Sequence, residues 1–82
     1  MTEFACCAGS RWSAVTDLGS AESFDFILGT CDGCGRYWMN VWSPVAPPAR
    51  YLSVENDVAE RLSAIPAGTA RKRALATWFD AQ

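Results

Sequence analysis

The stretch Cys31-Asp32-Gly33-Cys34-Gly35 decides how this sequence is interpreted. Two cysteines separated by two residues can bring both sulfurs to one ion, because the intervening residues reverse the chain. Gly35 permits the positive backbone angle that such a turn needs. Asp-Gly between the cysteines is typical of an exposed tight turn and not of a core strand. The stretch therefore predicts half of a tetrahedral metal site.

The other half is predicted at Cys6 and Cys7. The 82 residues include no histidine, so a metal would be held almost wholly by sulfur, which favours one structural Zn²⁺ over a disulfide framework. Adjacent side chains of an extended segment point in opposite directions, so both reach one ion only through an unusual local turn. Two alternatives stay open: no metal binds, or one of the pair binds and a carboxylate completes the site (Glu3, Asp17 or Glu22).

Cys31 and Cys34 also have other conceivable uses. As buried thiols they would pack like small hydrophobes. A disulfide-exchange motif places its first cysteine at a helix N-terminus, whereas strand-like residues follow here. Iron held by four thiolates uses the same turn geometry as zinc. Redox chemistry or electron transfer is therefore the third functional class.

Size and composition indicate one globular domain over residues 1–82. The chain is 50% hydrophobic and 20% charged, and a domain this small needs a staple or a partner to be stable. The N-terminus lacks a cationic run followed by an apolar block, and no apolar run approaches the roughly 20 residues that span a bilayer. We expect a cytoplasmic protein without a membrane partner, in a compartment where thiols stay reduced.

Two-residue alternation predicts three short strands, at residues 11–16, 24–28 and 37–42, with 17–23 as the connection of the first hairpin. Residues 44–52 contain three prolines and are predicted as a linker. In residues 53–82 the apolar residues recur at helical spacing. The first helix is predicted to begin at an N-cap Ser53 and to bury Val54, Val58, Leu62 and Ile65.

The second helix is predicted to follow a break at Pro66-Ala67-Gly68. Thr69 can cap this helix. Four apolar residues then fall at the neighbour spacing that builds one helix face: Ala74, Leu75, Trp78 and Phe79. Both helices are short, so we expect them to pack on each other or on the sheet.

The turn at 31–35 resembles a knuckle of the zinc-ribbon, or zinc β-ribbon, family, and Arg36-Tyr37-Trp38 resembles the aromatic-bearing strand common after such a knuckle. The resemblance covers roughly residues 5–42. It implies a three-stranded sheet whose two knuckles clamp one zinc with four cysteines. The first knuckle departs from the family, which has two residues between its cysteines. The predicted fold is small α+β: a three-stranded antiparallel zinc ribbon (5–43), a proline-rich linker (44–52) and a C-terminal helical hairpin (53–82).

Trp38, Asn40 and Trp42 share one strand face and are a candidate partner-binding surface, since indoles combine large contact area with a hydrogen-bond donor. The alternative is that this face packs against the C-terminal helices. For Trp12 and Trp78 we favour a role in the core.

The run Arg71-Lys72-Arg73 lies in a first helical turn, where the helix dipole disfavours cations. It is the second candidate partner site, for a phosphate or an acidic surface. The structural alternative is that these cations are solvated or pair with acidic residues of the preceding helix, namely Glu55, Asp57 and Glu60.

The recognisable catalytic arrangements lack their parts here, because no histidine, no nucleophile with a base and no phosphate-binding loop is present. We therefore predict a non-catalytic zinc-binding module that acts as a protein-interaction adaptor or regulator, and no enzyme. The second choice is a nucleic-acid-binding ribbon. A net charge of −2 argues against a broad nucleic-acid face, although five cations are candidates to contribute: Arg36, Arg50, Arg71, Lys72 and Arg73.

Overall fold

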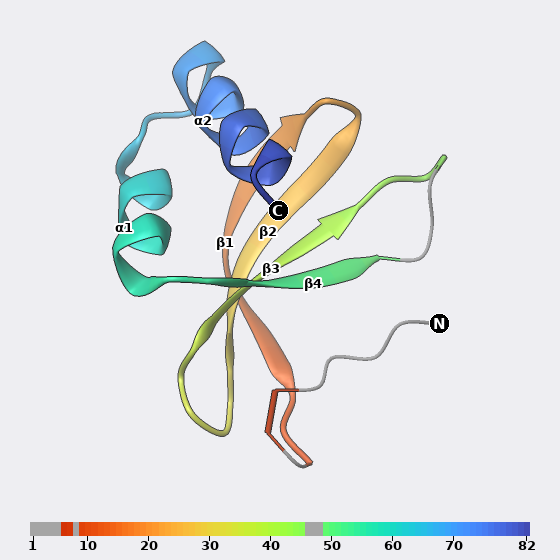
Figure 1. Ribbon diagram of the computed structural model, residues 1–82, viewed down its shortest axis with the longest axis vertical. Coiled ribbons are helices and arrows are strands. Elements are labelled where there is room, and N and C mark those ends of the chain that lie inside the picture. Colours follow the sequence, from red (N-terminus) through yellow and green to blue (C-terminus); the bar gives the residue numbers. More distant parts are fainter. Residues whose placement is uncertain (1–5, 8, 46–48) are drawn as a thin grey trace.

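The computed structural model describes residues 6–7, 9–45 and 49–82, and they form one antiparallel sheet followed by two helices (Figure 1). Each strand pairs with its neighbour in sequence, in the order β1-β2-β3-β4. The elements are β1 (Trp12–Ala21), β2 (Phe24–Cys31), β3 (Tyr37–Trp42), β4 (Arg50–Val54), α1 (Asn56–Ala64) and α2 (Thr69–Asp80). The predicted α+β class is confirmed, whereas the described residues contain four strands and not three.

The fourth strand corrects the predicted linker. Residues 50–52 belong to β4, which pairs with β3 from Val41↔Arg50 to Tyr37↔Val54. The prolines of this region all precede β4, so none of them removes a donor from its ladder. Ser53 is consequently a strand residue and no helix cap; Glu55 is the N-cap of α1, without a side-chain hydrogen bond. The predicted linker residues 46–48 lie outside the described residues.

The first strand is longer than predicted, and the expected connection at 17–23 is wrong over most of its length. β1 continues to Ala21, and the chain turns at Glu22 and Ser23, both with positive φ (56° and 69°), which suits a tight hairpin. Register shifts at Ala14/Thr16 and at Asp17/Gly19 interrupt the two-residue alternation of β1. A bulge leaves an extra residue on one strand, so the polarity pattern loses its phase and the strand is hard to recognise.

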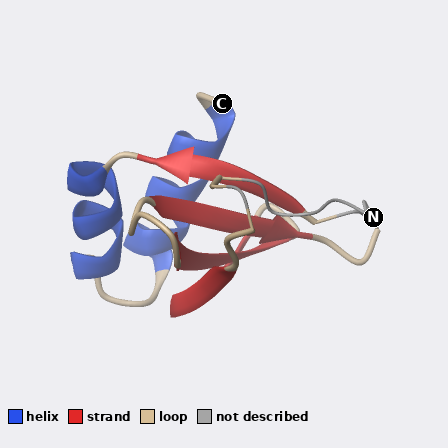
Figure 2. Ribbon diagram, turned by 90° about the horizontal axis from the view of Figure 1, so that it is seen from below, coloured by secondary structure: helices blue, strands red, loops and turns tan. Residues whose placement is uncertain are grey.

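The hydrophobic core lies between one face of the sheet and the two helices. Figure 2 shows both helices on the same side of the strands. The buried cluster takes residues from every strand and both helices: Leu18, Ala21, Phe26, Leu28, Met39, Val41, Val54, Ala59, Leu62 and Leu75. In Figure 1 the helices lie near one end of the sheet, and the β2–β3 turn lies at the opposite end.

The predicted apolar face of α2 packs as expected. Leu75 is fully buried, and Ala74, Trp78 and Phe79 pack against the core. The Phe79 ring lies 5.7 Å from that of Phe26, in an edge arrangement. The helix begins at Thr69 with Gly68 as its N-cap, so the predicted Thr69 cap is wrong by one residue. No helix in the described part of the chain has the length and apolarity to cross a membrane.

Candidate metal centre

The four cysteines meet at the end of the sheet away from the helices. Cys31 is the last residue of β2 and pairs with Trp12 at the start of β1. This pairing brings the segment before β1, which carries Cys6 and Cys7, beside the β2–β3 turn that carries Cys34 (Figure 1). The sulfur atoms of all four cysteines lie within 4.8 Å of one another.

The separations between the sulfurs fit a tetrahedral thiolate site. Zn–S bonds of about 2.3 Å place the sulfurs of a tetrahedron roughly 3.8 Å apart. The Sγ of Cys6 lies 3.6 Å from that of Cys34 and 4.0 Å from that of Cys7. The chemistry and spacing of this set therefore suit one metal ion that prefers four sulfur ligands.

The turn after β2 has the backbone geometry predicted for a metal knuckle. Gly35 adopts a φ of 77°, and its N–H donates to the carbonyl of Cys31 at 2.8 Å. The N–H of Gly33 donates to the Sγ of Cys31 at 3.3 Å. Amide hydrogen bonds of this kind orient a thiolate and stabilise its charge.

In the first knuckle, hydrogen bonds with Ser10 hold a turn in which both adjacent cysteines reach the sulfur cluster. The backbone N–H of Ser10 donates to the carbonyl of Cys7 at 3.0 Å, and its hydroxyl donates to the same carbonyl at 2.8 Å. The N–H of Cys7 in turn donates to the Ser10 hydroxyl at 3.1 Å. Gly9 has a φ of 71°, as a tight turn requires. Gly9-Ser10 in the sequence indicates a turn, but no local pattern indicates this role of the hydroxyl.

Glycine also allows the two knuckles to approach each other. A Cβ on Gly33 would lie 3.2 Å from the Cβ of Cys7 and 3.3 Å from that of Ser10, which is tighter than ordinary van der Waals contact. The Asp-Gly pair between Cys31 and Cys34 therefore does more than form a turn. It leaves the space that the other knuckle occupies.

Carboxylates do not join this cluster among the described residues. Asp17 accepts a hydrogen bond from the N–H of Gly19 at 2.9 Å, and Glu22 is exposed in the turn at the far end of β1 and β2. Glu3, the third carboxylate that the sequence offered, lies outside the described residues. Both Cys6 and Cys7 lie within the sulfur cluster, so a carboxylate is not needed to complete a set of four.

Three thiols of the cluster differ in how readily they lose a proton. A hydrogen bond with the Ser10 hydroxyl lowers the pKa of Cys31 to about 6, against the opposing effect of burial. Hydrogen bonds with Cys34 and Cys31 raise the pKa of Cys7 to about 12. Burial raises the pKa of Cys6, and the nearby Trp38 side chain opposes that rise. A bound divalent cation would remove these differences, because it stabilises the thiolate form of every ligand.

Trp38, Asn40 and Trp42 lie on the sheet face opposite the helices. They alternate along β3 with Met39 and Val41, which are buried in the core. The alternative that this face packs against the C-terminal helices is therefore wrong. The three residues nevertheless differ in exposure. Trp42 is 42% exposed, whereas Trp38 and Asn40 are half-buried and the Nε1 atom of Trp38 is fully buried.

Trp12 lies across this same face and not in the main core. Its Nε1 donates to the backbone carbonyl of Trp38 at 3.0 Å, and its ring meets that of Tyr51 edge-on at 5.5 Å. Gly29 makes room for it, since a Cβ there would lie 2.3 Å from the Trp12 ring. The contact joins side chain and backbone 26 residues apart, so local sequence patterns do not signal it.

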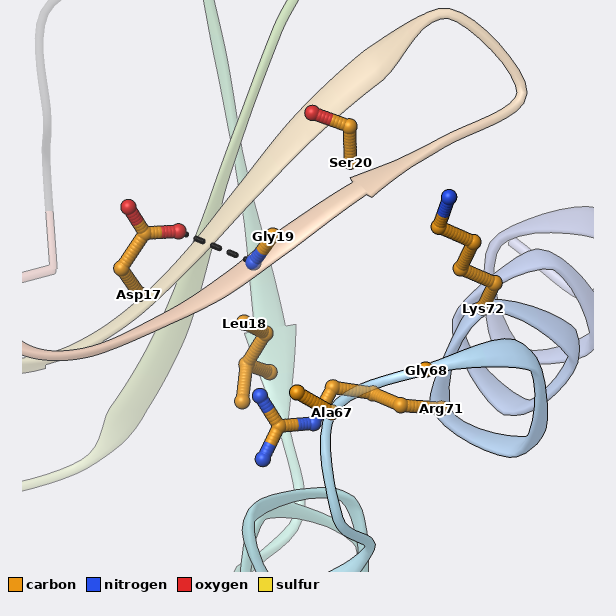
Figure 3. A pocket seen from close by; sticks show the side chains of 8 residues that line it. All are labelled: Asp17, Leu18, Gly19, Ser20, Ala67, Gly68, Arg71 and Lys72. Carbon is orange, nitrogen blue, oxygen red and sulfur yellow. Dashed lines mark hydrogen bonds between the residues drawn. The ribbon is translucent and has the colours of Figure 1, made fainter.

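The basic run on α2 does not converge on one site. Arg71 and Lys72 line a pocket between the start of α2 and β1, but their charged groups point in different directions (Figure 3). The Nε of Arg71 donates to the carbonyl of Ile65 at 2.9 Å and so ties α2 to the end of α1. Arg73 lines a separate groove beside Trp78. Among the described residues these cations form no ion pair with Glu55, Asp57 or Glu60, so the predicted pairing is wrong. The other half of the structural alternative, solvated cations, agrees with the exposure of Lys72 and Arg73.

Comparison with protein-family models, curated proteins and solved structures finds no match for this chain.

Proposed function

We propose that this chain is a small non-catalytic module that holds one Zn²⁺ with Cys6, Cys7, Cys31 and Cys34. The observation that carries the proposal is the approach of all four sulfurs to within 4.8 Å. A site with four protein ligands has no open position for a substrate, which is typical of structural zinc and not of catalytic zinc. The resemblance of the second knuckle to the zinc-ribbon family supports the same metal.

The role of the ion follows from the position of the cysteines. The main core lies between the sheet and the helices, and the cysteines lie at the other end of the sheet. An ion would tie the segment before β1 to the β2–β3 turn and stabilise the strand ends there. Metal binding would then contribute directly to the free energy of folding.

Metal analysis of protein purified without chelator tests this proposal. We expect one zinc per chain in the wild type, and loss of zinc from both Cys34→Ser and Cys6→Ser. Asp32→Asn is the matched control, because it changes the same turn without removing a sulfur, and it should retain zinc. Iron in place of zinc would give a coloured protein and favour electron transfer. A wild-type chain that binds neither metal contradicts the proposal.

We also infer that the module acts as a protein-interaction adaptor. Two surfaces support this view. One is the exposed Trp42 on β3. The other is an apolar groove of about 600 Å³ between α1 and α2, whose lining includes Ile65 and Trp78 together with Arg61 and Arg73. Exposed aromatic and arginine side chains are enriched in protein interfaces. Nucleic-acid binding is less favoured, because the cations of α2 diverge.

A salt series on complexes formed after nuclease digestion separates the two classes of partner. Protein partners held by apolar contacts should stay bound as salt rises, whereas binding through phosphates weakens steeply. Trp42→Ala should reduce retention of a specific protein. Val15→Ala is the control, since Val15 is equally apolar and 58% exposed on another strand. Binding that disappears with nuclease or at moderate salt contradicts the adaptor function.

A further inference from the structure

The groove between α1 and α2 has an apolar lining that the core holds in place. Its volume is about 600 Å³, and its apolar residues include Ile65, Ala74 and Trp78. Each of these three is only half-buried. The Trp78 ring also lies 6.5 Å from that of Phe26, in an edge arrangement. The core therefore fixes this indole, while part of its surface stays accessible from the groove.

The charged residues that line the groove are both cationic. Arg61 comes from α1 and Arg73 from α2, and both are exposed. Among the described residues neither guanidinium has an ion pair or a hydrogen bond with a side chain. The acidic residues of the two helices do not line the groove: Asp57, Glu60 and Asp80. Two like charges beside one apolar surface repel each other, so an acidic occupant is favoured there.

We propose that this groove binds an acidic, amphipathic helix of a partner protein. The apolar face of such a helix packs against Ile65 and Trp78, in the manner of other helices that bind in apolar grooves. Its carboxylates pair with Arg61 and Arg73, because the planar donor group of arginine matches the two oxygens of a carboxylate. The inference rests on the proposed adaptor function and deepens it, since it names the chemistry of the partner.

The surroundings of the groove argue against two other occupants. Nucleic-acid binding draws on many cations along one surface, whereas Lys72 does not line this groove and the Nε of Arg71 is bound to the Ile65 carbonyl. A second copy of this chain, docked symmetrically through the same groove, would bring both arginines of one copy against both arginines of the other. A helix with an apolar face and carboxylates complements the groove in shape and charge.

Three synthetic helical peptides of about 14 residues, or four helical turns, test the inference by calorimetry. All carry leucines at the anchor spacing i, i+3, i+4 and i+7. Their polar positions carry Glu, Gln or Lys. We expect the Glu peptide to bind about 2- to 30-fold more tightly than the Gln peptide, which is the effect of two exposed ion pairs, and the Lys peptide to bind most weakly. Equal affinity for the Glu and Gln peptides, or no binding of the Glu peptide, would overturn the inference.

The double variant Arg61→Gln/Arg73→Gln assigns the charge effect to the groove. It keeps polar side chains at two exposed positions, so the thermal midpoint should not change. Its affinity for the Glu peptide should fall by the same 2- to 30-fold or so, while its affinity for the Gln peptide stays that of the wild type. Lys72→Gln is the matched control, because Lys72 is exposed on the same helix outside the groove. Wild-type affinity for the Glu peptide in the double variant would overturn the inference.

Nuclear magnetic resonance of the wild-type chain locates the bound peptide. The Glu peptide should shift the indole N–H signal of Trp78 and the methyl signals of Ile65, and it should leave the exposed Trp42 of β3 unchanged. Three results would overturn the inference: shifts at Trp42 in place of Trp78, dimerisation that moves the Trp78 signal without peptide, or displacement of the peptide by a single-stranded oligonucleotide. If the peptide tests fail while Trp42→Ala still reduces retention of a protein, the adaptor function stands without this groove. If both fail, the adaptor function itself is overturned.

Discussion

Removal of the metal should destabilise the folded chain by an amount that thermal unfolding resolves easily. The perturbation is a chelator with reductant, applied to the zinc-loaded protein. An ion present at a thousandfold excess over its dissociation constant stabilises the folded state by about 4.1 kcal/mol. For 82 residues the entropy of unfolding is about 0.17 kcal/mol per kelvin, so the midpoint should fall by roughly 24 °C.

Unfolding after metal removal should begin at the end of the sheet that carries the cysteines. Among the described residues the buried hydrophobic cluster lies between the sheet and the helices. At the end of the sheet that carries the cysteines, Cys31 is the residue that is fully buried. Hydrogen exchange after chelation should therefore accelerate first where Trp12 pairs with Cys31, and later at Phe26 in the core. Circular dichroism gives the midpoint. Equal midpoints with and without chelator, with zinc loss verified in the same sample, would refute the role of the ion in folding.

Three further predictions concern single groups. Zinc affinity should fall as the pH is lowered, and the fall should become steeper by about one proton per ion below about pH 6. Below its pKa of about 6, Cys31 carries a proton that it must release to solvent when zinc binds; competition titrations from about pH 5 to pH 8 measure this slope. Gly29→Ala should lower the free energy of unfolding by about 1–3 kcal/mol in urea titrations, because the new methyl group would meet the Trp12 ring. Arg71→Glu should cost about 0.5–1.5 kcal/mol by loss of its bond to the preceding helix, whereas Lys72→Glu, in the same first helical turn without such a bond, should be neutral or raise stability by about 0.3–1 kcal/mol; an equal loss in both variants would contradict the dipole argument.

The cysteine cluster was largely predictable because its sequence signals are local. A Cys-x-x-Cys-Gly turn determines its own backbone, and Gly35 has the positive φ that the spacing indicates. The grouping of Cys6 with Cys7 followed from counting possible sulfur ligands. The turn that makes this grouping possible was not predictable, since it depends on the Ser10 hydroxyl and on the space above Gly33.

The errors in the fold occurred where pairing between strands determines the structure. β4 was not predicted because the residues before it are rich in proline, which indicates a linker. It forms a strand because it pairs with β3. β1 was cut short because two register shifts disturb its alternation. The prolines before β4 and the irregular alternation of β1 are both typical of loops. In each case the hydrogen bonds to a neighbouring strand outweighed this local preference.

The aromatic residues show how one face of a small sheet can serve two purposes. An 82-residue chain buries enough apolar surface for one core, and here that core lies on the helix side. On the opposite face Trp12 and Trp38 lie over strands that end at the cysteine cluster, and the Trp12 indole donates to the Trp38 backbone carbonyl. Trp42, four residues beyond Trp38 along β3, is exposed. The same face can therefore support the strands near the cysteine cluster at one end and contact a partner at the other. Gly29→Ala, which displaces the Trp12 ring, should lower stability, whereas Trp42→Ala should reduce partner binding.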